Sequence, residues 1–205
     1  MTENLNYIAF DFETATYNKN SACSIDLVAF ENGKEIDSVY SLIHPAKMYF
    51  IPEWTRDIHG ISYDDVRNKP YFPEVWQNLV IPFLEKYKDF PLVAHNGDSF
   101  DKYVVKACCD YFEMEYPDYE FIDSLKIARK TWTDFDNHRL TSLGEKFGIV
   151  YKAHDALEDS RTCGMVIAEA AKVWGVNSVR ELLEKCNLSF SKLSNLDSRF
   201  QEAVV

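Results

Sequence analysis

Long hydrophobic runs are missing from this sequence. No stretch approaches the roughly 18 consecutive apolar residues that a membrane-spanning helix requires. The first six residues carry Glu3 and no basic side chain, so the pattern of a secretory signal peptide is also missing. We therefore expect a protein that has no membrane partner and is located in the cytoplasm.

Closely spaced cysteine pairs are missing as well. The five cysteines include no C-x-x-C pattern, and Cys108 and Cys109 are adjacent. A zinc site usually takes ligands that are paired at short spacing, and a secreted disulfide framework usually has an even number of cysteines. We expect reduced and mostly buried thiols.

Glycine and proline are sparse, with 7 of each among 205 residues, and we find no repeat or low-complexity tract. The hydrophobic fraction of 46% and the charged fraction of 27% are close to those of globular domains. These values exclude disordered, collagen-like and coiled-coil chains. The length suits one domain. We expect it to span residues 1–176, with residues 177–205 as a C-terminal helix and tail that extend the same domain.

Acidic residues outnumber basic residues in this sequence. The chain has 22 Lys and Arg against 33 Asp and Glu, which gives a net charge of −11. An acidic chain argues against a protein that coats long duplex DNA through a broad basic face. Residues 126–152 are a local exception, with six basic and three acidic side chains. They are expected either to contact phosphates or to form solvated helix faces.

The hydrophobic pattern predicts strands first and helices later. Residues 6–12, 25–30 and 34–43 have the composition of strands, and Asn32-Gly33 is a strong hairpin signal. Residues 91–95 and 121–122 predict two further short strands. Loops and short helices are expected over 45–73, and helices over 75–84, 100–112, 124–132, 141–147, 156–174 and near 179–183. This order predicts an α/β fold: a mixed β-sheet with a meander of three strands plus parallel strands, flanked by α-helices.

The first candidate site is Asp11-Phe12-Glu13, at the end of the first predicted strand. Residues 11 and 13 of a strand share one face, while Phe12 points to the other face and into the core. Two carboxylates beside a buried strand need a compensating cation, and a divalent metal ion would supply it. In isolation, a solvated strand end explains this short pattern more simply.

The second candidate site is the strand–turn–helix segment of residues 93–101. Ligands gather at such turns in α/β sheets. Asp98 and Asp101 are both candidate metal carboxylates. Asp98 also suits a helix N-cap, and Asp101 suits the positive end of the helix dipole.

The third candidate site is the segment from His154 to Asp159. Asp155 suits the cap of a helix that starts near Ala156, which places Asp159 about one turn into the helix. His154 lies in the preceding loop, where a surface histidine is the simpler reading of this segment alone.

Together the three segments resemble the motifs of the DEDDh 3′–5′ exonucleases, a family with a ribonuclease H-like fold. Its members include the proofreading subunit of bacterial DNA polymerase III and the three-prime repair exonucleases. The resemblance covers residues 7–174. Residues 11–14 match D-x-E-[TA], residues 95–101 match the second motif, and residues 154–159 match H-x-A-x-x-D.

The second motif departs from the pattern of many members. Three residues, Gly97 to Ser99, separate Asn96 from Phe100, where many members have two. This makes Asp98 a competitor for the ligand position. We favour Asp101, because it directly follows the aromatic residue of the motif.

The resemblance implies a metal-dependent enzyme with two Mg²⁺ or Mn²⁺ ions held by Asp11, Glu13, Asp101 and Asp159. It implies that His154 takes a proton from the attacking water and that 5′-nucleoside monophosphates leave a nucleic acid 3′ end. The residues expected near the substrate are Phe12, Thr14, Ala15, His59, Ile61, Asn96 and Phe100.

We expect single-stranded or mismatched DNA as the substrate, in proofreading or repair, with a polymerase or repair protein as a candidate partner. Trimming of RNA ends is the alternative within the same chemistry. An inactive module that binds nucleic acid or docks on a polymerase is the alternative from another class.

Overall fold

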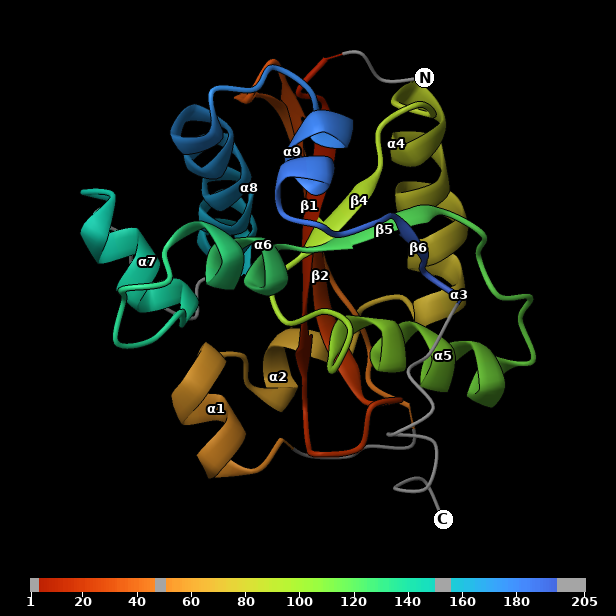
Figure 1. Cartoon of the computed structure of the whole chain (residues 1–205). Coiled ribbons are helices and arrows are strands. Elements are labelled where there is room, and N and C mark those ends of the chain that lie inside the picture. The colour runs from red at the N-terminus through yellow and green to blue at the C-terminus, as the bar shows by residue number, and fades with distance from the viewer. Residues whose placement is uncertain (1–3, 47–50, 150–155, 195–205) are drawn as a thin grey trace.

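The computed structural model describes residues 4–46, 51–149 and 156–194. Within these residues the strands form one mixed sheet that has helices on both faces (Figure 1). The strands are β1 (Tyr7–Thr14), β2 (Ala22–Glu31), β3 (Lys34–Leu42), β4 (Leu92–Ala94), β5 (Glu120–Asp123) and β6 (Ser191–Lys192).

The order of strands across the sheet is β3-β2-β1-β4-β5-β6. The first three strands pair antiparallel, and β4 and β5 run parallel to β1. The predicted meander followed by parallel strands is confirmed. The short strand β6, which pairs antiparallel with β5, was not predicted.

The three meander strands differ in detail from their predicted bounds. β1 extends to Thr14, so both candidate carboxylates at its end lie within the strand, and β2 begins at Ala22. Asn32 and Gly33 have φ angles of 51° and 72°. Positive φ at both central residues is what a two-residue type I′ hairpin requires, so the predicted turn is confirmed.

Most helices lie where the sequence predicts them, and one region differs. The single helix expected over residues 75–84 is instead a succession of α3 (Phe72–Val75), a π-helical segment η1 (Trp76–Val80) and α4 (Ile81–Lys86). Pro82 has no N–H and cannot continue a regular α-helical ladder. The other helices are α1 (Glu53–His59), α2 (Tyr63–Val66), α5 (Asp101–Phe112), α6 (Ser124–Thr131), α7 (Leu140–Lys146), α8 (Ala156–Trp174) and α9 (Val179–Lys185).

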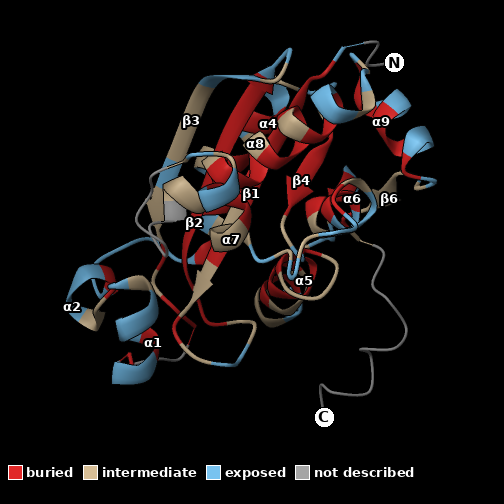
Figure 2. Ribbon diagram, turned by 60° about the vertical axis from the view of Figure 1, so that its left-hand side comes forward, coloured by how far each residue is buried: buried red, intermediate tan, exposed pale blue. Residues whose placement is uncertain are grey.

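Each face of the sheet has its own hydrophobic core. Ile8 and Phe10 of β1 point to the face that carries α3, α4 and α5, whereas Tyr7 and Ala9 point to the face that carries α6 to α9. Figure 2 shows the central strands as the buried layer between these helices. Because side chains alternate along a strand, Asp11 and Glu13 continue the face that carries α8.

The segment after residue 176 contributes to this structure. Val179, Leu182 and Leu183 of α9 are buried in the core on the α8 face, and β6 extends the sheet. We propose on this basis that residues 177–194 belong to the same domain as residues 1–176. In the described part of the chain, no helix is both long and apolar enough to cross a membrane.

Candidate active site

The site begins where β1 and β4 separate. The two strands pair only through Ile8 and Ala9 of β1, so among the described residues no strand lies on the β4 side of the end of β1, whereas β2 pairs with β1 as far as Thr14. The backbone N–H of Phe12 instead donates to Oδ1 of Asp101, the first residue of α5, over 3.2 Å. This bond fixes a buried carboxylate next to the carboxylates of β1.

The predicted acidic residues lie close enough to influence one another. Burial raises the pKa of Glu13 to about 8, with further contributions from Asp159 of α8 and from Asp101. Burial also raises the pKa of Asp101 to about 7, although the Phe12 N–H lowers it. The pKa of Asp11 lies well above its usual range, because of burial and then because of Asp101 and other carboxylates. The structure therefore brings Asp11, Glu13, Asp101 and Asp159 together.

A fifth carboxylate, Asp26, escaped the sequence interpretation. It lies on β2 directly opposite Asp11 and is fully buried. Burial raises the pKa of Asp26 well above the usual range. The nearby Ser160 hydroxyl lowers this pKa in part, and the carboxylate of Asp159 raises it further. The signal that could have revealed it is an acidic residue in an otherwise apolar strand.

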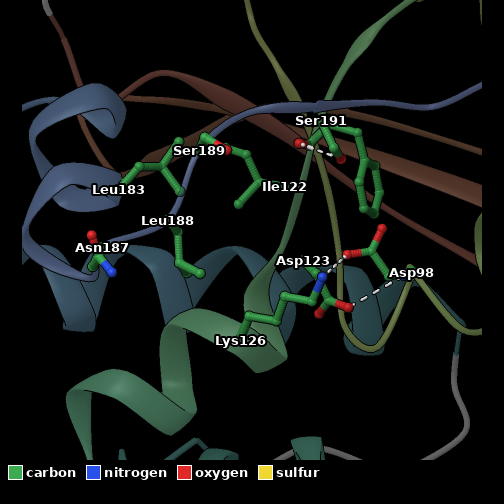
Figure 3. A pocket seen from close by; sticks show the side chains of 10 residues that line it. Asp98, Ile122, Asp123, Lys126, Leu183, Asn187, Leu188, Ser189 and Ser191 are labelled. Carbon is green, nitrogen blue, oxygen red and sulfur yellow. Dashed lines mark hydrogen bonds and ion pairs between the residues drawn. The ribbon is translucent and has the colours of Figure 1, made fainter. Parts of the chain in front are cut away.

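Asp98, the competitor of Asp101, has other partners. It forms an ion pair with Lys126 (Figure 3). A second ion pair, at 2.6 Å, joins it to the buried Lys102. Burial alone would raise the pKa of Asp98, but the two lysines hold it below its usual value. Lys102 also donates to Ser191 Oγ over 2.8 Å. Asp98 thus connects the β4–α5 loop to α6 and β6, whereas Asp101 faces β1.

A cavity of about 450 Å³ lies beside Asp98 (Figure 3). It is lined by Lys126 of α6, by Leu183 of α9 and by residues of β5 and β6. Among the described residues, its lining includes Asp98 and Asp123 but none of the four clustered carboxylates. We therefore do not assign the reaction to this cavity.

The loop between β4 and α5 is held by Asp123, the last residue of β5. The carboxylate of Asp123 accepts the N–H of Asn96 at 3.0 Å, of Asp98 at 3.2 Å and of Leu125 at 2.9 Å. A Cβ on Gly97 would lie 2.6 Å from Ala94 Cβ and from the Phe121 ring. The close approach at Gly97 therefore requires glycine.

His95 anchors the same loop to the neighbouring helices. Its Nε2 donates to the His138 carbonyl over 2.9 Å, and its Nδ1 pairs with the Ser124 hydroxyl at 2.8 Å. Burial lowers the pKa of His95 to about 4. The ring is therefore neutral near pH 7 and connects loops rather than carrying charge.

Three residues predicted to contact the substrate are buried and form contacts within the protein itself. The Phe12 side chain is in the core, and its N–H binds Asp101. Ala15 is buried, its N–H donates to the Ser21 carbonyl, and its own carbonyl accepts from Thr55. Ile61 is buried in a small apolar cluster with Ala15.

The other predicted substrate residues lie nearer the surface. Asn96 is exposed, in a left-handed conformation with φ 63°, while Thr14 and Phe100 are partly exposed. His59 Nδ1 accepts the N–H of Ile61 over 3.0 Å, which shapes the turn after α1. His154 lies outside the described residues.

The clustered carboxylates fit divalent metal ions in their chemistry. Carboxylate oxygens are the ligands that hard cations such as Mg²⁺ prefer. Asp101 Oδ2 is buried and has no hydrogen-bond partner among the described residues. A nearby cation would relieve the burial cost and mutual repulsion that raise these pKa values. Within the described residues, no three His, Cys, Asp or Glu side chains already form a metal-binding group.

The mixed sheet with its meander, flanked by helices and with acidic residues at the end of β1, defines a ribonuclease H-like fold. Within that class the chain belongs to the exonuclease family, because a family model described as "Exonuclease" matches residues 8–166. The predicted resemblance to DEDDh exonucleases is confirmed.

Individual proteins are similar to this chain, one in sequence and two in fold. The chain is 29% identical over 178 residues to DNA polymerase III PolC-type of Listeria welshimeri, which covers 83% of this chain but 12% of the relative. It thus spans only a small part of that relative. The nuclease domain of 3′hExo, a DEDDh family member solved with rAMP, superposes with a TM-score of 0.69 at 19% identity and covers 93% of this chain and 96% of that one. Exonuclease X, solved with 5′ overhanging duplex DNA, gives 0.66 at 20% identity and covers 88% and 99%.

Proposed function

We propose that this protein is a metal-dependent 3′–5′ exonuclease that hydrolyses phosphodiester bonds at DNA 3′ ends and releases 5′-nucleoside monophosphates. The observation that carries the proposal is the cluster of Asp11, Glu13, Asp101 and Asp159 at the open end of β1, in a chain of the exonuclease family. Single-stranded or mismatched ends are the expected substrates.

The four clustered carboxylates would hold two Mg²⁺ or Mn²⁺ ions. Asp11 occupies the centre of the proposed ligand set, Glu13 and Asp159 belong to one site, and Asp101 supports the second. A pair of bound ions would stabilise the attacking and leaving oxygens of an in-line displacement at phosphorus.

The protein positions these ligands through its backbone. The Phe12 N–H holds one oxygen of Asp101 and leaves Oδ2 for another partner. Asp123 and Gly97 fix the loop from which α5 starts. His154 is proposed as the base that takes a proton from the attacking water, because imidazole side chains commonly take up and release protons near neutral pH.

DNA is favoured as the substrate because relatives of this chain are named as DNA polymerases. A polymerase or repair protein is a proposed partner for the same reason. RNA is the second candidate, since a solved neighbour carries rAMP. Discrimination between the two depends on how the site treats the 2′-hydroxyl.

The deciding experiment uses single-stranded DNA, 3′-mismatched duplex DNA and single-stranded RNA of one sequence, each labelled at the 5′ end. The full chain is incubated with Mg²⁺, Mn²⁺ or EDTA. We expect stepwise shortening from the 3′ end that EDTA abolishes, with nucleoside 5′-monophosphates as products. No shortening of any oligonucleotide with either metal would overturn the proposal and would favour an inactive binding module.

The matched control is Asp11→Ala, purified in the same way. It removes the proposed central ligand and should lose activity. Full activity in this variant would identify the nuclease as a contaminant.

A further inference from the structure

Lys19 places a positive charge beside the carboxylate cluster. It belongs to the loop of residues 15–21, which connects the acidic end of β1 to β2. Its Nζ lies 3.5 Å from the centre of the Phe100 ring, and Phe100 directly precedes Asp101. The Lys19 ammonium is near enough to Asp101 to lower the pKa of that carboxyl, against the larger effect of burial.

The loop that carries Lys19 has a defined conformation. Ser21 Oγ donates to the Asn18 carbonyl over 2.6 Å, and the Ser21 carbonyl accepts the Ala15 N–H over 2.8 Å. The Lys19 carbonyl accepts from the Cys108 thiol of α5 over 3.9 Å. The backbone of Lys19 is therefore attached to the helix that supplies Asp101.

Lys19 differs from other lysines around this end of the sheet in the partners of its ammonium group. Lys102 and Lys126 form ion pairs with Asp98. In the described ranges of the chain, the Lys19 ammonium forms no ion pair and no hydrogen bond, although the side chain is partly buried. Burial lowers its pKa. A cation that has lost water without gaining a donor–acceptor partner is suited to bind an anion.

A phosphate is the anion that fits this place. The proposed metal ions would neutralise the clustered carboxylates, which would weaken the attraction between Asp101 and Lys19. Lysine ammonium groups bind phosphate oxygens through charge-assisted hydrogen bonds. We propose, building on the proposed function, that Lys19 is a substrate-binding residue whose ammonium contacts one of the first two phosphates from the 3′ end of a single-stranded nucleic acid.

The test combines a protein variant with a neutral substrate linkage. Single-stranded DNA is prepared with one uncharged methylphosphonate at the first, second, third or fourth linkage from the 3′ end. Affinities for the wild-type protein and for Lys19→Met are measured by fluorescence anisotropy with Ca²⁺ in place of Mg²⁺, so that the proposed ion sites are filled, and the DNA is checked afterwards to be intact. With unmodified DNA we expect Lys19→Met to bind about tenfold more weakly. At the first or second linkage, the methylphosphonate should remove most of this difference.

The salt dependence gives a second readout. Losing one phosphate contact on a single strand should reduce the slope of log affinity against log salt by about 0.7. Lys19→Arg, which keeps the charge, should retain most of the affinity. Lys88→Met is the matched control, because Lys88 is exposed in the turn that leads into β4, at the opposite end of the strands. It should bind like the wild type.

Two results would overturn the inference. One is unchanged affinity in Lys19→Met. The other is an equal loss with every modified DNA and an unchanged salt slope, which would make Lys19 a structural counter-ion of Asp101. The wild-type protein is tested for hydrolysis of the unmodified DNA in parallel. If the wild-type protein shortens DNA but no single methylphosphonate removes the effect of Lys19→Met, only the role of Lys19 is rejected. If the wild-type protein neither binds nor shortens any DNA, the proposed function is rejected as well.

Discussion

Asp98 and Asp101 are three positions apart, yet their surroundings give them opposite chemistry. Asp98 is held by two lysines that lower its pKa, whereas burial and, to a lesser extent, the carboxylate of Asp123 raise the pKa of Asp101. In the sequence both residues are candidates, and Asp101 is favoured only because it directly follows Phe100 in the motif. The difference depends on which way the β4–α5 loop turns, and Asp123 and β6 fix that direction.

The two residues should therefore respond differently to the same substitution. We expect Asp101→Asn to reduce exonuclease activity by about 100-fold or more, because it removes a charge from the proposed ligand set. Asp98→Asn should cost less than about tenfold in activity but lower the free energy of unfolding by about 1–3 kcal/mol, since it weakens the partner of the buried Lys102. Initial rates on labelled DNA and urea unfolding measure the two effects. A greater loss of activity in Asp98→Asn would assign the ligand position to Asp98.

The raised pKa values predict how stability depends on pH. Glu13 and Asp101 have folded-state pKa values of about 8 and 7, above those expected in an unfolded chain. Between about pH 4 and pH 8 the folded state keeps protons that the unfolded state has lost. The free energy of unfolding of the metal-free protein should therefore fall as the pH rises through this window.

Divalent metal ions should oppose this fall, because they bind ionised carboxylates. We expect added Mn²⁺ to raise the melting temperature more at pH 8 than at pH 5. Thermal unfolding in EDTA and in Mn²⁺ at both pH values measures this, with Glu13→Gln as the control that should flatten the pH slope. A metal-free protein that is more stable at pH 8 than at pH 5 would contradict the prediction.

Among the elements, α8 comes unusually near the sheet. A Cβ on Gly164 would lie 2.1 Å from the Phe30 ring, and the Tyr7 hydroxyl donates to the Gly164 carbonyl over 2.8 Å. Gly164 therefore lets the helix that carries Asp159 pack closely against β1 and β2.

Gly164→Ala should force these elements apart. We expect the free energy of unfolding to fall by about 1–3 kcal/mol through overpacking, despite the better helix propensity of alanine. Val173→Ala, at a position that is 60% exposed on the same helix, should change it by less than about 0.5 kcal/mol. Urea denaturation followed by circular dichroism compares the two. Equal stability of Gly164→Ala and the wild type would show that the close contact is not needed.

Elements that are encoded by local sequence patterns were predicted, whereas elements that depend on packing against distant parts of the chain were not. β1, the Asn32-Gly33 turn and α8 are encoded locally by side-chain alternation, by a two-residue turn signal and by helical periodicity. The π-helical segment at Trp76–Val80 and the two-residue strand β6 depend on packing against other elements. Asp26 went unrecognised because its partner, Asp11, is fixed by pairing between strands. Local patterns carry no signal for the π-helical segment or for β6, and for Asp26 they show only an acidic residue in a mostly apolar strand.

At the scale of the whole molecule, α9 and β6 complete a core and a sheet that begin near the N-terminus. We expect a chain of residues 1–176 to unfold at lower urea concentration than the full chain or not to fold at all, because it lacks buried side chains of α9. Leu182→Ala in the full chain is the finer test and should cost about 2–5 kcal/mol. A 1–176 chain with the unfolding free energy of the full chain would show that residues 177–205 form a separate unit.

The carboxylate cluster also has a consequence during synthesis of the protein on the ribosome. Asp11 emerges early, but Asp159 belongs to a helix that is synthesised much later, and the two meet only after long-range folding. A nascent chain that still lacks α8 holds an incomplete ligand set for the proposed ions. If the proposed function is correct, the enzyme would be inactive while it is being translated. It would become able to cut nucleic acid only when α8 docks against the sheet.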